Sequence, residues 1–142
     1  MQFFGEYRHT VDAKGRVIVP ARMREALEGD SAYLVKYFDG CVAMFNQPEF
    51  ERFVEQLKTL QRSNEIARQL YRNLGGGTSI EAVDKQGRII VPTTLREWAG
   101  ITKDVLIVGS IDHAELWEPT QYAERQRLDQ AQLNEQSQHL TF

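Results

Sequence analysis

Apolar and polar residues alternate in several short segments of the chain, and this spacing of two predicts β-strands. Pro20 and Pro92 each follow one of these segments, and each is expected to open a short helix because proline suits the first helical turn. Each half of the chain is therefore predicted to be a ββαββ unit whose first two strands form a hairpin. The expected strands span 6–11, 16–19, 32–38 and 41–46 in the first half, and 79–83, 88–91, 104–110 and 114–118 in the second.

Between the halves the apolar spacing changes to that of amphipathic helices. One helix is expected to begin near Pro48, and a second is expected over about 64–74. Gly75, Gly76 and Gly77 are expected to end the second helix and to act as a hinge. A third helix is expected from about Pro119, and the glutamine-rich segment after Leu128 is expected to fray.

The two halves are copies of one another. Asp12 aligns with Asp84, 72 residues later, and at this offset nine of the fifteen residues 11–25 are identical to residues 83–97. One half alone would bury too little apolar surface to be stable, so we expect the two halves to complete each other's sheet as a pseudo-dimer with an α+β fold. The predicted organisation is a first repeat at 5–47, a helical linker at 48–75, a second repeat at 76–120, and a C-terminal helix and frayed tail at 121–142.

The loop between the first two strands has the same signature, Asp-x-x-Gly-Arg, in both copies. Glycine can supply the positive φ of a tight turn. Aspartate can accept hydrogen bonds from turn amides or pair with the arginine four residues later. The expected turn-stabilising residues are Asp12, Gly15, Asp84 and Gly87.

Basic residues gather around the first loop, and they suggest a second role for it. Lys14 lies at the loop tip, Arg8 lies on the preceding strand, and Arg22 and Arg24 follow on the expected short helix. A two-stranded ribbon with such residues fits the DNA major groove, where arginine or lysine can bond guanine O6 and N7. The candidate DNA-binding residues of both copies are Arg16, Lys14, Arg8, Arg22, Arg88 and Lys85.

The paired motifs VDAKGRVIVP and VDKQGRIIVP, their spacing and the helical linker resemble the MraZ family, within the wider AbrB/SpoVT group, over about residues 3–120. The resemblance implies a double-split β-barrel built from both halves and a ring-like homo-oligomer. It also implies binding to short, G-rich direct repeats in the promoter of the division and cell-wall gene cluster, with repression of that cluster and of the protein's own gene. The family's D-x-x-x-R motif corresponds to Asp12 with Arg16 and to Asp84 with Arg88, and Arg16 is the expected DNA contact.

The net charge of −3 and the pI of about 5.6 limit the strength of any DNA contact by one subunit. We therefore expect multivalent binding, in which an oligomer adds several weak contacts. Arg16 is expected to contact base edges, and Lys14, Arg8 and Arg22 are expected to contact phosphates. The second half is more acidic, so Arg88 could instead serve only as a turn brace.

Other function classes receive less support. No apolar run approaches the ~20 residues of a membrane helix, and no signal peptide is recognisable, so we expect a cytoplasmic, nucleoid-associated protein. The single cysteine, the scattered histidines and the absence of catalytic motifs predict no enzyme, no metal, no cofactor and no small-molecule substrate. Two alternatives stay open: an AbrB-type antitoxin that binds a toxin through its tail, and a structural ring whose basic loops bind protein partners.

Overall fold

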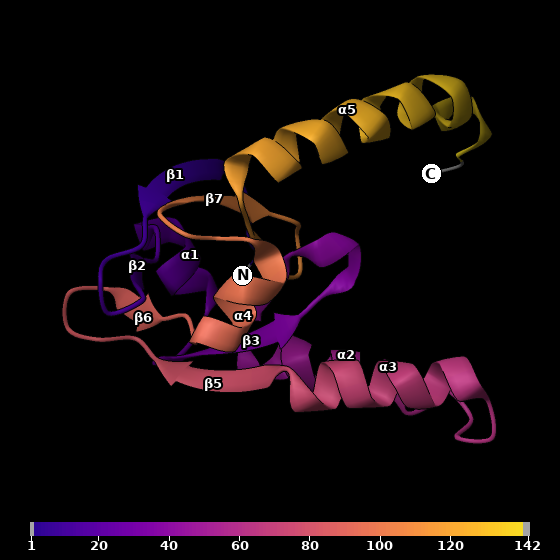
Figure 1. Cartoon of the computed structure of the whole chain (residues 1–142), viewed down its shortest axis with the longest axis horizontal. Helices are drawn as coiled ribbons and strands as arrows, with labels where there is room; N and C mark the ends of the chain where they lie inside the picture. Colours follow the sequence, from indigo (N-terminus) through magenta and orange to yellow (C-terminus); the bar gives the residue numbers. More distant parts are fainter. Residues whose placement is uncertain (1, 141–142) are drawn as a thin grey trace.

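The elements predicted by the hydrophobic pattern are present in the computed structural model, which describes residues 2–140 and shows an α+β fold (Figure 1). Both halves have the predicted ββαββ order, with boundaries that differ by a residue or two from the expected ones. The strands are β1 (Glu6–Thr10), β2 (Arg16–Ile18), β3 (Ser31–Lys36), β4 (Val42–Phe45), β5 (Thr78–Ala82), β6 (Arg88–Ile90), β7 (Asp104–Gly109) and β8 (Ala114–Trp117). The α-helices are α1 (Ala21–Ala26), α2 (Gln47–Leu57), α3 (Glu65–Gly76), α4 (Thr93–Ala99) and α5 (Pro119–Gln136).

Six strands form one antiparallel sheet in the order β1-β7-β8-β4-β3-β5. The first strand of each half pairs with the third strand of the other half, and the two halves meet where β4 pairs with β8. This exchange confirms that the halves complete each other's sheet. Because β1 and β5 are edges of this sheet, the strands described here do not confirm the double-split barrel that the resemblance implies.

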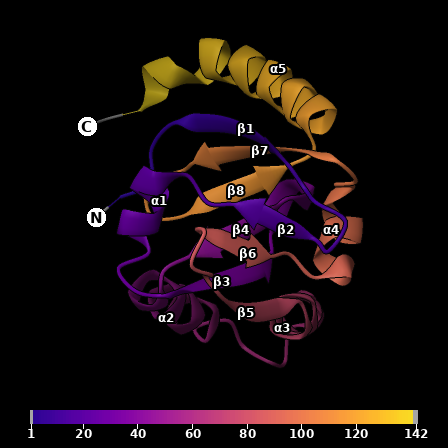
Figure 2. The ribbon, with the colours of Figure 1, turned by 90° about the vertical axis from the view of Figure 1, so that its left-hand side faces the viewer.

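The predicted hairpins do not form. β2 does not pair with β1; instead it pairs with β6 of the other half, with Val17 opposite Ile89. The pattern correctly predicted short strands, but it could not identify their partners because the two copies have nearly the same sequence. The pair β2–β6, called the ribbon below, lies in front of the six-stranded sheet in Figure 2.

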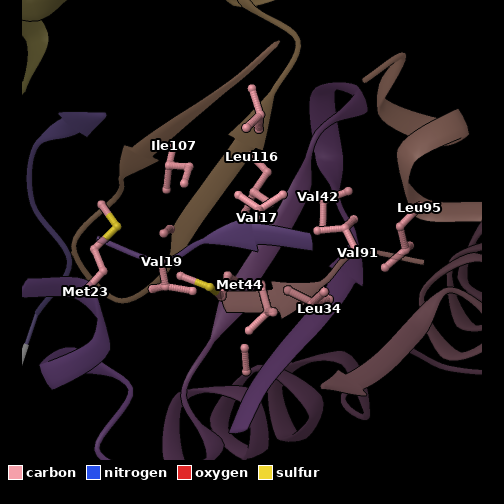
Figure 3. Packing of buried hydrophobic residues seen from close by; sticks show 14 of the residues in the cluster. Val17, Val19, Met23, Leu34, Val42, Met44, Val91, Leu95, Ile107 and Leu116 are labelled. Atoms are coloured by element: carbon pink, nitrogen blue, oxygen red, sulfur yellow. The ribbon is translucent and has the colours of Figure 1, made fainter. Parts of the chain in front are cut away.

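The main core lies between the ribbon and one face of the sheet. Alternate residues of the ribbon strands point inward, and Val17 and Ile89 are each only 1% exposed. They join Leu34, Met44 and residues from α1 and α4 in one buried cluster, much of which is visible in Figure 3. Removing this apolar surface from water holds the ribbon against the sheet, since two three-residue strands could not be stable alone.

The linker helices pack on the opposite face of the sheet. Aromatic residues of α2 contact Phe45 of β4, whose ring stacks on Phe53 at 5.1 Å between centroids. The helix α3 includes Gly75 and Gly76 as its last residues, so these two glycines extend the helix and do not form the predicted hinge. The C-terminal helix α5 begins at Pro119 as predicted and continues to Gln136, beyond the point where fraying was expected.

Candidate nucleic-acid interface

The first loop, residues 12–15, is organised by one carboxylate. The backbone amides of Lys14 and Arg16 both donate to Asp12 Oδ1 at 2.9 Å, and Arg16 Nε donates to Oδ2 at 2.6 Å. Gly15 adopts a φ of 81°, as expected for glycine in a tight turn. The brace engages only Nε of the Arg16 guanidinium. Within residues 2–140 its two terminal amino groups form no hydrogen bond, so they remain available to a ligand.

The second loop, residues 84–87, repeats this brace with one difference. Asp84 accepts from the amides of Gln86 and Arg88 at 2.9 Å and from Arg88 Nε at 2.8 Å. Here, however, Arg88 Nη2 also donates to the side-chain oxygen of Gln86. Lys14 occupies the corresponding position in the first loop, and a lysine cannot accept this bond. The guanidinium of Arg88 is therefore more fully occupied than that of Arg16.

Both aspartates are held in the ionised form. The backbone amide of Arg16 and then its guanidinium favour the carboxylate of Asp12 and lower its pKa to about 2. The same contacts from Arg88 lower the pKa of Asp84. Each carboxylate neutralises part of the charge of its arginine, so the loops present oriented donors more than a strong positive field.

Each loop is also fastened to the other half of the chain. The amide of Val19 donates to Gly87 O, and the amide of Val91 donates to Gly15 O, both at 2.8 Å. Two arginines outside the predicted set brace the strand end of their own half, since Arg24 donates to Val19 O and Arg96 donates to Val91 O, both at 2.9 Å. Folding of the whole chain, and not of one half, therefore sets the position of each loop.

The outer surface of the ribbon, called the ribbon face below, carries two arginines and two isoleucines. The strands alternate, so the residues between the buried positions point outward: Arg16, Ile18, Arg88 and Ile90. The register places Arg16 opposite Ile90 and Ile18 opposite Arg88. The side chains of Arg16 and Arg88 are 30% and 25% exposed. The two loops lie at the left-hand end of the molecule in Figure 1, and their residues 12–14 and 84–86 are exposed.

The remaining predicted basic residues are distributed unevenly. Lys14 and Lys85 are exposed on their loops, and neither forms an ion pair within the described residues. Arg22 is exposed on α1, beside the N-terminal residues Gln2 and Phe4.

Arg8 lies on the other face of the sheet from the ribbon. It shares that face with Glu6, which accepts from Tyr122 of α5, and it lies 4.0 Å from Asp104. The structure therefore separates Arg8 from the other candidate residues.

The histidines and the cysteine form no comparable site. Burial opposes a charge on His113, but hydrogen bonds to Glu115 and Asp112 outweigh it and raise the pKa of this histidine. Burial raises the pKa of the Cys41 thiol, which therefore stays protonated and unreactive. Within residues 2–140, no three His, Cys, Asp or Glu side chains are grouped to hold a metal ion, and no helix is long and apolar enough to cross a membrane.

A family model and individual relatives of this chain both indicate the same family. The family model described as "MraZ protein, putative antitoxin-like" matches residues 2–73 and again residues 74–141. Relatives named transcriptional regulator MraZ include one from Lachnoclostridium phytofermentans, 45% identical over 81% of this chain and 80% of its own length. Another, from Caldanaerobacter subterraneus subsp. tengcongensis, is 39% identical over 96% of this chain and 94% of its own.

These relatives define a class of transcriptional regulators, not of enzymes. The chain belongs to the MraZ family and carries two copies of its domain. Among solved structures, the solution structure of PHS018 from Pyrococcus horikoshii is 23% identical and covers 79% of this chain and 97% of its own. Its TM-score of 0.33 is too low to inform the fold.

Proposed function

We propose that this protein is a sequence-specific DNA-binding repressor of the division and cell-wall gene cluster, including its own gene. The observation that carries the proposal is the ribbon face, where a two-stranded element presents Arg16 and Arg88 outward next to exposed Lys14 and Lys85. A two-stranded ribbon fits the major groove, and membership of a family of transcriptional regulators supports a DNA partner. The protein would act in the cytoplasm, associated with the nucleoid.

Arg16 is the residue proposed to contact bases. Asp12 holds its Nε, which fixes the plane of the guanidinium before DNA arrives, and both terminal amino groups stay free. These two groups can donate together to O6 and N7 of one guanine, which suits the proposed G-rich repeats. Because the side chain is already ordered, binding costs less conformational entropy than it would for a mobile arginine.

Lys14, Lys85 and Arg22 are proposed to contact phosphates, which supply affinity but little sequence information. Arg8 is left out of this interface because it lies on the face of the sheet that α5 occupies. Arg88 is proposed to contribute less than Arg16, since Gln86 holds one of its amino groups.

Affinity is proposed to come from assembly into a ring. Few cations reach the ribbon face, and the net charge of −3 gives the chain no general attraction for DNA. Several ribbon faces on one ring could engage successive direct repeats, and each further contact then benefits from a high effective concentration. The ribbon and the six-stranded sheet are proposed to correspond to the family's double-split barrel.

A binding assay at two salt concentrations tests the proposal. Promoter DNA from upstream of the gene that encodes this chain should bind far more tightly than a random duplex, with an affinity that falls as salt increases. Equal affinity for both duplexes would overturn sequence-specific binding. No binding to either duplex would favour the antitoxin or the structural ring.

The multivalent part of the proposal has its own test. Cutting the promoter fragment to a single repeat should weaken binding sharply, because the remaining contacts lose the benefit of effective concentration. A single repeat that binds as tightly as several would show that one subunit suffices.

A further inference from the structure

We infer that Ile18 and Ile90 read the methyl groups of thymine next to the guanines contacted by arginine. This inference rests on the proposed function, since it concerns the same surface and the same DNA. It adds a second kind of specificity, an apolar one, to a site that was predicted from its charges alone.

The first observation is exposure. Ile18 and Ile90 are 45% and 48% exposed, whereas the neighbouring apolar residues of the same strands are only 1% exposed. A single exposed isoleucine on a protein surface needs no explanation. Here, however, both copies of the repeat place an isoleucine at the same outward position, and both lie on the ribbon face.

The second observation is the register. Ile18 stands directly opposite Arg88, and Ile90 stands directly opposite Arg16. Residues opposite each other in an antiparallel pair have Cβ atoms about 4.5–5.5 Å apart. Each isoleucine is therefore a direct neighbour of one arginine on the ribbon face.

The third consideration is the chemistry of the major groove. Its base edges offer hydrogen-bond donors and acceptors, and the C5-methyl group of thymine is its characteristic apolar feature. An arginine pair bonds guanine, and an adjacent aliphatic side chain can cover a thymine methyl. The ribbon face carries both residue types side by side, so it matches a sequence in which guanine and thymine are close neighbours.

The spacing of residues along the ribbon limits how far the thymine can lie from the guanine. Neighbouring strands lie about 4.7–4.9 Å apart, and two residues along a strand span about 6.6 Å. Successive bases along a DNA strand lie about 3.4 Å apart. The thymine should therefore lie within one or two base pairs of the guanine that Arg16 contacts.

A structural explanation for these isoleucines also exists. β-branched residues favour strands, so isoleucine could be present only because it stabilises β2 and β6. The two explanations differ in one measurable way: a purely structural residue cannot respond to a methyl group on the DNA.

The experiment replaces thymine by deoxyuridine, which removes the methyl group and keeps every base-pair hydrogen bond. The promoter fragment from upstream of the gene is prepared in both forms, and each is titrated with the full-length protein. The wild type should bind the thymine duplex more tightly, by about fourfold for each methyl contacted, as expected from burying one such group. The I18A/I90A variant should bind both duplexes equally.

Two controls separate a direct contact from a general effect. Ile66 is 63% exposed on α3, away from the ribbon, so I66A should keep the wild-type preference for thymine. If deoxyuridine acted only by changing DNA shape, I18A/I90A would keep that preference too. The variant I18V/I90V retains a branched aliphatic surface and should keep most of the preference, and circular dichroism checks that all variants fold.

The outcomes distinguish this inference from the function on which it rests. Promoter-specific binding with no preference between thymine and deoxyuridine would overturn the role of the isoleucines alone. A preference that survives in I18A/I90A would do the same. Failure of the wild type to distinguish promoter from random DNA would overturn both proposals.

Discussion

The two loops of this protein share one construction but present their arginines differently. In both, an aspartate braces the arginine four residues later, and the loop glycine accepts a hydrogen bond from the other half. In the first loop, Lys14 leaves the amino groups of Arg16 free. In the second loop, Gln86 accepts a bond from Arg88. A duplication has therefore preserved the loop geometry, while two positions, Ala13/Lys85 and Lys14/Gln86, have changed what each loop offers to a ligand.

This comparison separates two roles that one motif can serve. The aspartate and glycine of each loop are needed for its shape, and the two copies keep them identical. The residue before the glycine makes no such contribution in the first loop, where Lys14 points its charge to solvent. A substitution at that position can therefore give the two loops different ligand-binding properties without disturbing the fold.

The largest expected effect comes from the two arginines. Arg16→Ala should cost about 1–3 kcal/mol of discrimination between promoter and random DNA, because one bidentate contact to guanine is lost. Arg88→Ala should cost less, since Gln86 already holds part of that guanidinium. Fluorescence anisotropy with both duplexes measures the losses, and thermal melting checks that both variants fold. Equal losses would mean that the two loops engage DNA alike.

The glycines test how firmly each loop is held. Alanine at Gly15 or Gly87 should cost about 1–2 kcal/mol of the free energy of unfolding, because both residues have a left-handed φ near 80°. Gly87→Ala should cost about 1 kcal/mol more, since its methyl group would collide with the guanidinium of Arg24 and break the bond to Val19 O.

Urea denaturation of both glycine variants measures this difference. Gly76→Ala is the matched control, because this glycine lies within α3, where a methyl group meets nothing within 4 Å. It should be neutral or slightly stabilising. Equal costs at Gly15 and Gly87 would show that Arg24 does not clamp the second loop.

Substitutions of the residue before each loop glycine, Lys14 or Gln86, test whether this residue causes the difference between the two loops. Lys14→Gln should reduce the slope of log affinity against log salt by about 1, because one phosphate contact is lost. Gln86→Lys should release Arg88 and add a cation, so it should strengthen binding and steepen the slope. If Gln86→Lys leaves both quantities unchanged, the second loop lies outside the interface.

The smallest expected effect concerns the ionisation of the two braces. The carboxyl group of Asp12 should titrate near pH 2, well below its ordinary value, and that of Asp84 should also titrate low. Since these pKa values are lowered on folding, their contribution to stability is present above the ordinary value and is lost as the pH falls through the folded one.

Carbon-detected NMR of the aspartate side chains follows this titration. Arg16→Ala should raise the pKa of Asp12 only partly, because the backbone amide of residue 16 is the larger cause and remains in place. An ordinary pKa for Asp12 in the wild type would mean that the brace does not form in solution.

Much of the fold could be predicted from the sequence, because alternation and helical spacing are local signals. The strands, the proline-led helices and the internal duplication all follow from such signals. The pairing of β2 with β6 could not be predicted, since residues 16–19 and 88–91 suit a hairpin equally well. Which strand β2 or β6 pairs with depends on how the two halves pack together. Because the two copies are nearly identical, the sequence contains no signal that distinguishes pairing within a half from pairing between halves.

The candidate site also contains features that could be predicted from the sequence and features that could not. The expected roles of Asp12 and Gly15 in the turn follow from their chemistry, and in the structure Asp12 accepts the amide of Arg16 while Gly15 has a positive φ. Arg24 and Arg96 were not predicted to matter for the loops, because each bonds a backbone carbonyl and lies against the loop glycine of the other half only in the folded chain. Ile18 and Ile90 were not predicted as site residues, because the expected hairpins did not specify which face of the strands would be buried against the sheet. The alternation that buries Val17 would have placed Ile18 outward once the ribbon was known.

The central claim is that the ribbon face is the surface that meets DNA. Isoleucine methyl NMR tests it directly, because isoleucines lie on the ribbon face and also away from it, as at Ile66 on α3. Adding promoter DNA should shift the signals of Ile18 and Ile90 and leave that of Ile66 in place. A shift confined to Ile66, with Ile18 and Ile90 unmoved, would contradict the claim.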